Sequence, residues 1–141
     1  MSPKPGTLTA VQVIFFIRAA LGFVVAILAF VGLNAMSEAE VQRTTGFGSG
    51  GLMFFLLIGV AVSVFELYVA STIGRGGHRT RTLVRVAAGL GIALVLLNML
   101  TGESFLLGLV LMIVVLVLNE SASAKDWYQE TEYPAPRPGA V

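Results

Sequence analysis

Apolar residues are concentrated in four long segments of the chain, and short polar stretches separate them. The segments cover about residues 11–33, 52–73, 82–100 and 105–118. A helix needs about 20 residues to cross a hydrocarbon core of about 30 Å, and the first three segments reach that length. The fourth reaches it only if its helix continues through the polar run NESASA toward Trp127 and Tyr128, an aromatic pair suited to the headgroup zone. We expect that continuation.

Continuous apolar runs of this length are typical of helices. A strand of a membrane barrel would instead appear as a segment of about ten residues with alternating polarity, and backbone polar groups in lipid must pair internally. The sequence therefore predicts an all-α fold, a bundle of four transmembrane helices with antiparallel, up-down topology. The expected helices cover about residues 10–34, 52–73, 82–100 and 104–124.

The composition agrees with a membrane environment. Hydrophobic residues make up 56% of the 141-residue chain and charged residues only 12%, whereas soluble domains carry about 25% charged residues. We therefore expect a multi-pass protein of the cell membrane, with lipid as its main solvent.

The distribution of charge between the connections predicts the orientation. The second connection carries Arg75, His78, Arg79, Arg81 and Arg85 and no acidic residue. Basic residues in short connections favour the cytoplasmic side, so this basic loop and both termini are expected there. In this arrangement residues 1–9 form a cytoplasmic tail, residues 10–124 form the transmembrane domain, and residues 125–141 form a disordered cytoplasmic tail.

The first connection is expected outside the cell and contains a helix-start signal. Ser37 is followed three residues later by Glu40, which is the spacing of a capping box. We expect a short surface helix that continues to about Arg43.

Two charged residues interrupt the apolar segments at matching depth. Arg18 lies eight residues from the expected start of the first helix, about 12 Å deep, and Glu66 lies seven residues from the end of the second, about 10 Å deep. A charge near the centre of a membrane helix costs about 2.5 to 3.5 kcal/mol on insertion scales, which favours pairing. We predict an intramembrane ion pair between Arg18 and Glu66. The alternative for Arg18 is that its long side chain reaches the interface alone.

Small residues at helical spacing mark the expected contact faces, since they let helix backbones approach closely in lipid. Asn98 can in addition hydrogen-bond to a neighbouring helix. The residues expected in helix packing are Gly22, Ala29, Gly59, Ser63, Ala70, Ala87, Gly91 and Asn98.

Enzymatic chemistry finds no support in the residue types. The chain has no cysteine and one histidine, and His78 has no acidic or histidine neighbour in sequence. A nucleophile with its base, or a cluster of metal ligands, therefore does not assemble. We expect no catalytic residues, no metal and no cofactor, and the lack of interleaved aromatic residues in the basic loop argues against nucleic acid as a partner.

A proton or cation site at Glu66 is the alternative function, because a membrane carboxylate can exchange protons. Four-helix small multidrug transporters work as dimers through a glutamate of their first helix. This chain has Arg18 and no acidic residue in that helix. A partner arginine favours a fixed ion pair over a proton carrier.

Several short motifs carry a resemblance to a group of proteins. PGTLTA precedes the first helix, SEAEV lies in the first connection, RTLVRV follows the basic loop, and LN comes shortly before DWY. With these motifs the chain resembles the small four-helix integral membrane proteins of actinobacteria, most of which are uncharacterised. The resemblance implies membrane location and no particular activity, cofactor or binding residue.

Two function classes remain from the sequence. The first is a structural or accessory membrane protein that engages other membrane components, with the lipid bilayer, anionic headgroups at the basic loop, and a membrane-protein partner or a second copy as its contacts. The second is a small oligomeric, proton-coupled transporter that uses Glu66.

Overall fold

The computed structural model describes residues 2–100, 106–133 and 139, and within them every regular element is helical. In chain order the elements are α1 (Gly6–Ala35), α2 (Glu38–Thr45), α3 (Ser49–Thr72), the short 3-10 helix η1 (Ile73–Arg75), α4 (Gly77–Leu100), α5 (Leu106–Asn119) and α6 (Ala122–Glu132). The connection expected between the third and fourth apolar segments, residues 101–104, lies outside the described residues.

Three helical segments of the described chain are long and apolar enough to cross a membrane. They are Gly6–Ala35, Ser49–Arg75 and Gly77–Met99. A fourth span is reached only if α5 and α6 are counted as one, and a bend of 58° separates them. Each segment contains a long apolar stretch and pairs its backbone groups within the helix, as a lipid environment would demand.

The expected continuous fourth helix, residues 104–124, is wrong. The described part of α5 ends at Asn119, and α6 begins a new helix at Ala122. Ser121 causes the break because its hydroxyl donates to the carbonyl of Leu118 and accepts from the backbone N–H of Ala124, so it acts as the N-cap of α6.

Helices α1 and α4 begin earlier than predicted. Residues 6–9 are the first turn of α1, and the carbonyl of Pro5 accepts the N–H groups of Leu8 and Thr9. Helix α4 begins at Gly77, directly after Gly76, whose φ of +70° suits a residue without Cβ. Most of the predicted basic loop therefore lies on the first turns of a helix.

The short helix predicted in the first connection is confirmed. Helix α2 begins with a complete capping box, in which Ser37 accepts from the N–H of Glu40 and the Glu40 carboxylate accepts from the N–H of Ser37. Its end is marked by Gly46 at φ +76°. Glu38 then accepts from the N–H of Ser49, which ties α2 to the start of α3.

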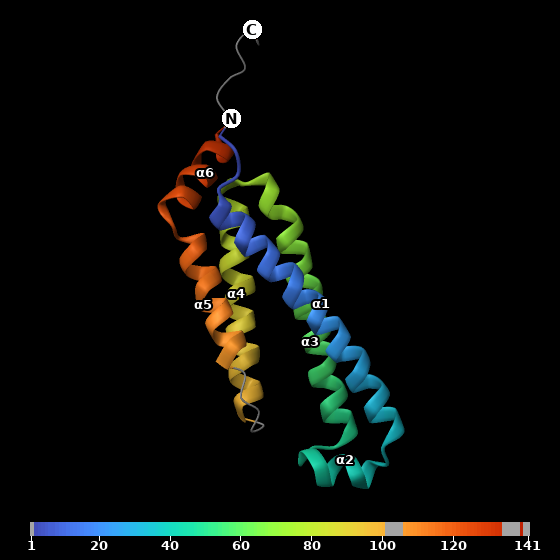
Figure 1. Ribbon diagram of the computed structural model, residues 1–141. Coiled ribbons are helices and arrows are strands. Elements are labelled where there is room, and N and C mark those ends of the chain that lie inside the picture. The colour runs from blue at the N-terminus through green and yellow to red at the C-terminus, as the bar shows by residue number, and fades with distance from the viewer. Residues whose placement is uncertain (1, 101–105, 134–138, 140–141) are drawn as a thin grey trace.

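The long helices form two pairs that diverge from one end of the molecule (Figure 1). Helices α1 and α3 contact each other, as do α4 and α5, and α6 lies where the pairs meet. We call this the closed end and the opposite end, beside α2, the open end. Because the pairs separate toward the open end, each pair there lacks the other as a packing partner.

Buried residues confirm that the two pairs pack together only near the closed end. In α1 the buried residues all belong to the first half of the helix, and in α3 they all belong to the second half. The α1 set is Leu8, Val11, Phe15 and Ala19, and the α3 set is Ser63, Glu66, Val69, Ala70 and Thr72. The outer halves of both helices expose large apolar side chains, such as Leu28 at 66% and Phe54 at 62%.

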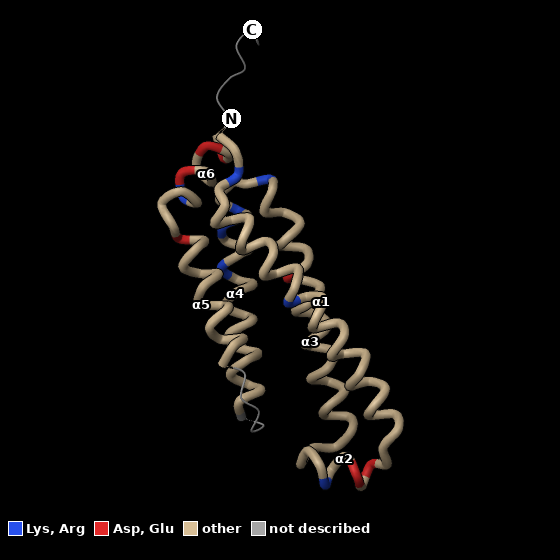
Figure 2. The backbone as a smooth tube through the Cα atoms, in the orientation of Figure 1, with Lys and Arg blue, Asp and Glu red and all other residues tan. Residues whose placement is uncertain are grey.

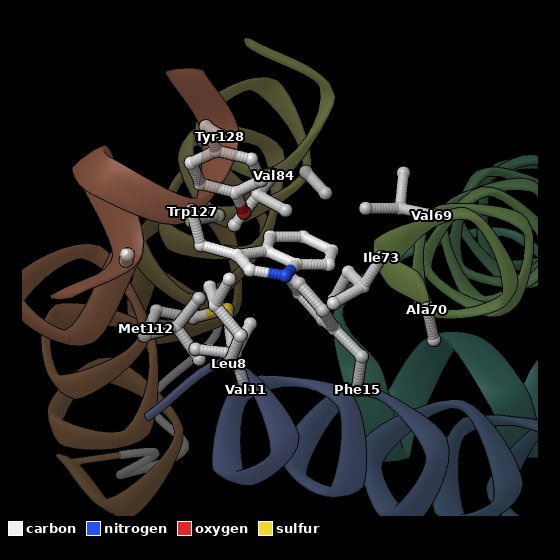
Figure 3. Packing of buried hydrophobic residues seen from close by; sticks show 14 residues of the cluster. Leu8, Val11, Phe15, Val69, Ala70, Ile73, Val84, Met112, Trp127 and Tyr128 are labelled. Atoms are coloured by element: carbon white, nitrogen blue, oxygen red, sulfur yellow. The ribbon is translucent and has the colours of Figure 1, made fainter. Parts of the chain in front are cut away.

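Helix α6 completes the core at the closed end (Figure 3). Ala124, Trp127 and Tyr128 are spaced on one face of α6 and are all buried. Figure 3 shows the Trp127 ring lying between the side chains of Leu8 and Val84. The prediction of a disordered tail from residue 125 onward is therefore wrong as far as Glu132, because the buried aromatic pair holds this segment as a helix.

Candidate functional site

An ion pair lies at the point where the two helix pairs begin to diverge. Arg18 extends from α1, and its Nη1 lies 2.9 Å from Oε1 of Glu66 on α3. The Glu66 side chain is 2% exposed and that of Arg18 is 17% exposed. The structure thus brings together the two charges that the sequence places at one depth.

Two neighbours make space for the Arg18 side chain. Its Nη1 contacts Sδ of Met112 on α5, and a Cβ added to Gly91 on α4 would lie 2.7 Å from the same nitrogen. All four long helices therefore contribute to this site. Oε1 of Glu66 is buried and accepts no hydrogen bond from the described residues, so its contact with Arg18 is a charge contact without a well-directed N–H.

The predicted packing residues divide into two groups. Ser63, Ala70, Ala87 and Gly91 are buried at helix contacts, and a Cβ on Gly22 would collide with the Ser63 hydroxyl. At the closed end the Ala70 carbonyl also accepts from Nε2 of Gln12 at 2.9 Å.

The second group of predicted packing residues lies nearer the open end. Ala29 and Asn98 are exposed, and a Cβ on Gly59 would have nothing within 4 Å. Gly59 lies on the same face of α3 as Ser63 and Glu66. Ser63 and Glu66 are buried, whereas a Cβ on Gly59 would have space, so this face is packed toward the closed end and open toward the other.

The predicted basic loop also divides. Arg75, His78 and Arg79 are exposed, whereas Arg81 and Arg85 bind the carboxylate of Glu120, which lies beyond the last residue of α5. The hydrogen bond from Arg85, together with that from Arg81, holds the pKa of Glu120 well below its usual value. Two arginines of the predicted basic loop are thus engaged in fixing the end of α5 to α4.

Helix α6 caps the beginning of α4. Thr131 Oγ1 accepts from the N–H of Gly77 at 2.8 Å, and Glu132 Oε2 accepts from the N–H of His78 at 2.6 Å. A side chain on Gly76 would collide with Thr131, so the two glycines make space for this contact. Acidic and hydroxyl groups satisfy unpaired N–H groups at a helix N-terminus, where the helix dipole also favours negative charge.

A buried polar contact joins α6 to α5 behind this cap. The hydroxyl of Tyr128 donates to Oδ1 of Asn119 at 2.8 Å, and both side chains are almost fully buried. Sequence reasoning missed Asn119, Glu120, Thr131 and Glu132, and it assigned Trp127 and Tyr128 to the headgroup zone, whereas both are buried in the core. The signal that would have found them is the polar run beginning at Asn119, read as a helix end followed by Ser121 as a new N-cap.

The described residues hold no group of three or more His, Asp or Glu side chains able to bind a metal ion. Two surface hollows of the described residues lie beside residues 2–5 and α6, and between α2 and the ends of α1 and α3. Neither of these two hollows is lined by Arg18 or Glu66.

No protein-family model matches the chain, and no curated protein or solved structure matches it either.

Proposed function

We propose that the chain is a multi-pass protein of the cell membrane that acts as an accessory component, binding a helix of another membrane protein between its diverging helix pairs. The proposal includes the antiparallel topology, with the closed end and both termini in the cytoplasm and α2 outside. It includes no catalysis, cofactor or nucleic acid.

One observation carries the proposal: beyond the contact of Gly22 with Ser63, the contact faces of α1 and α3 continue into their outer halves, where the described residues leave positions open. On α1 the buried line of Leu8, Val11, Phe15 and Ala19 continues at helical spacing past Gly22, which faces Ser63, to Ala26 and Ala29, and Ala29 is exposed. On α3 the same continuation leads from Glu66 and Ser63 to the open position Gly59.

Small residues on such a face suit a helix rather than lipid alone. In a bilayer, apolar area by itself gives no reason for helices to associate, whereas small residues permit close backbone approach and dispersion contacts. The core at the closed end includes no residue from the outer halves of α1 and α3. A partner helix can therefore dock without rearrangement of that core.

The test places a photo-crosslinking amino acid at Ala29, with Val117 on the lipid-facing side of α5 as the control. We expect a discrete membrane protein to be captured at Ala29 and to co-purify in mild detergent, and only lipid to be captured at Val117. Lipid adducts alone at both positions would contradict the proposal.

A pair of substitutions makes the test specific. Gly59→Leu fills the open position on the contact face and should abolish co-purification, while Ala61→Leu, two residues away and so on the opposite side of α3, should not. Equal effects of the two substitutions would count against docking at this face.

A second candidate function is proton-coupled transport through Glu66. It is favoured by a buried carboxylate whose Oε1 accepts no hydrogen bond, and it is disfavoured by the Arg18 contact, which stabilises the charged form. A gradient-dependent flux of hydrophobic cations that Glu66→Gln abolishes, from a protein that purifies as a homodimer, would support transport over the accessory role.

A further inference from the structure

A second charged cluster lies at the closed end, on the outside of the bundle. It consists of Arg81, Arg85, Glu120 and Lys125, from α4, the α5–α6 connection and α6, and we call it the Glu120 cluster. Both arginines contact the Glu120 carboxylate, Arg85 through Nε at 2.6 Å, and Lys125 Nζ lies 3.9 Å from it. Three cations thus share one carboxylate, which leaves an excess of two positive charges.

The excess charge is available to a ligand. Arg85 is 44% exposed and uses only its Nε in a described contact, and Lys125 is 47% exposed with only its long contact to Glu120. Nε of Arg81 is buried and has no hydrogen-bond partner among the described residues. The acidic residues Asp126 and Glu130 of α6 line the hollow beside residues 2–5.

Apolar surface lies directly next to the cluster on both helices. On α4, Gly89 and Ala93 follow Arg85 at intervals of four and are exposed, and a Cβ on Gly89 would meet nothing within 4 Å. On α5, the exposed Val117 lies three residues before Glu120 on the same face. Because Arg85 and Glu120 are in contact, these two apolar faces adjoin below the cations.

We infer that the Glu120 cluster is a binding site for an anionic phospholipid. The phosphate binds the free nitrogens of Arg85 and Lys125, and an acyl chain lies along α4 over Gly89 and Ala93. Cations at the cytoplasmic boundary attract anionic headgroups. The excess positive charge of the cluster is complementary to a lipid phosphate with a net negative charge, whereas a zwitterionic headgroup carries no net charge to attract. The site goes beyond the proposed partner docking, which uses the opposite end of the molecule.

The test measures lipid retention by native mass spectrometry of the full chain in mild detergent. The protein is offered an equimolar mixture of phosphatidylglycerol and phosphatidylcholine with identical acyl chains. We expect retention of one phosphatidylglycerol, and the double variant Arg85→Gln, Lys125→Gln should reduce the preference for it by about fivefold per charge removed. No preference in the unmodified protein would overturn the inference.

The matched control removes the same charge elsewhere at the closed end. The double variant Arg75→Gln, Arg79→Gln should keep the preference, since both arginines are exposed and lie outside the cluster. If both double variants lost the preference for phosphatidylglycerol equally, the preference would come from diffuse attraction to surface charge, and the proposed site would be overturned. If the first double variant is unstable, Lys125→Gln alone, which removes the longest contact, should still reduce the preference.

A steric variant and a soluble competitor separate the apolar part of the site from the charged part. Gly89→Leu fills the space over α4 and should reduce the retained phosphatidylglycerol, whereas glycerol phosphate, the headgroup without acyl chains, should displace little of it. Unchanged retention in Gly89→Leu, or full displacement by glycerol phosphate, would overturn the placement of the acyl chain.

Discussion

At the scale of single residues, glycines and buried polar groups decide where the helices approach one another. Gly22 leaves space for the Ser63 hydroxyl, and Gly91 leaves space for the Arg18 side chain on its way to Glu66. In a membrane such positions have a large effect, because close approach is what lets helices gain dispersion contacts. Two predictions belong to this scale.

The first prediction concerns the buried pair. Arg18→Ala and Glu66→Ala should each lower stability in detergent, because removal of one partner leaves a buried charge, at a cost of about 3 to 5 kcal/mol in proteins where it has been measured. The double variant Arg18→Leu, Glu66→Met should recover much of the loss, since a well-packed apolar replacement is often neutral. The measurement is a double-mutant cycle by thermal or denaturant unfolding.

Leu21→Ala is the control for this cycle, because Leu21 is 59% exposed on the same helix and should contribute little. Additive losses, with coupling below about 0.5 kcal/mol, would mean that the pair is energetically independent despite its contact.

The second prediction concerns Gly22. The alanine in Gly22→Ala collides with the Ser63 hydroxyl and should cost about 1 to 3 kcal/mol, as overpacking does. Ser63→Ala in the same chain removes the colliding oxygen and should restore most of the stability. Gly32→Ala is the matched control, since its Cβ would meet nothing within 4 Å. A comparable loss of stability in Gly32→Ala would mean that the effect comes from the glycine-to-alanine change in α1 and not from the contact with Ser63.

At the scale of elements, α6 is the piece that fixes the closed end. It buries Trp127 and Tyr128 in the core, and it caps α4 through Thr131 and Glu132. The bend of 58° after α5 makes both contacts possible, because a straight continuation of α5 would carry these residues away from the start of α4. One break in a helix therefore closes the bundle.

The third prediction tests the contact between α5 and α6. Tyr128→Phe should lower stability by about 1 to 3 kcal/mol, because it leaves the buried Oδ1 of Asn119 without its donor. Hydrogen exchange of the α6 backbone should become faster. Tyr133→Phe is the control, since Tyr133 is 84% exposed, and similar effects of both substitutions would contradict this role of the buried hydroxyl.

At the scale of the whole molecule, the diverging pairs give two ends with different character. The closed end has the buried core, the capping contacts and most of the charged side chains, while the open end has exposed apolar helices and α2 (Figure 2). The proposed partner docking belongs to the open half and the proposed lipid site to the closed end.

The fourth prediction concerns the orientation of these ends. Reporter fusions after Arg79 and after Tyr133 should report from the cytoplasm, and a fusion near Gly48 should report from outside, because arginine bias sets orientation. An external signal after Arg79 would reverse the proposed arrangement and would place the Glu120 cluster at the outer leaflet.

The sequence by itself determined the helical class and the long apolar segments. A continuous apolar run of about 20 residues can satisfy its backbone groups in an apolar environment only as a helix, and the length of such a run can be read from the sequence. It also predicted Arg18 and Glu66 as partners, since two isolated charges within long apolar segments favour pairing. The capping box of α2 followed from local spacing alone.

Only the tertiary structure decided how the helices are arranged. The divergence of the pairs, the helical state of residues 125–132, and the use of Arg81 and Arg85 by Glu120 all depend on contacts between segments far apart in the chain. A hydrophobic pattern shows that a face is apolar, but in lipid an apolar face can meet either a helix or an acyl chain. Which of the two it meets is set by the packing at the closed end, where one serine turns the chain and brings α6 onto the core.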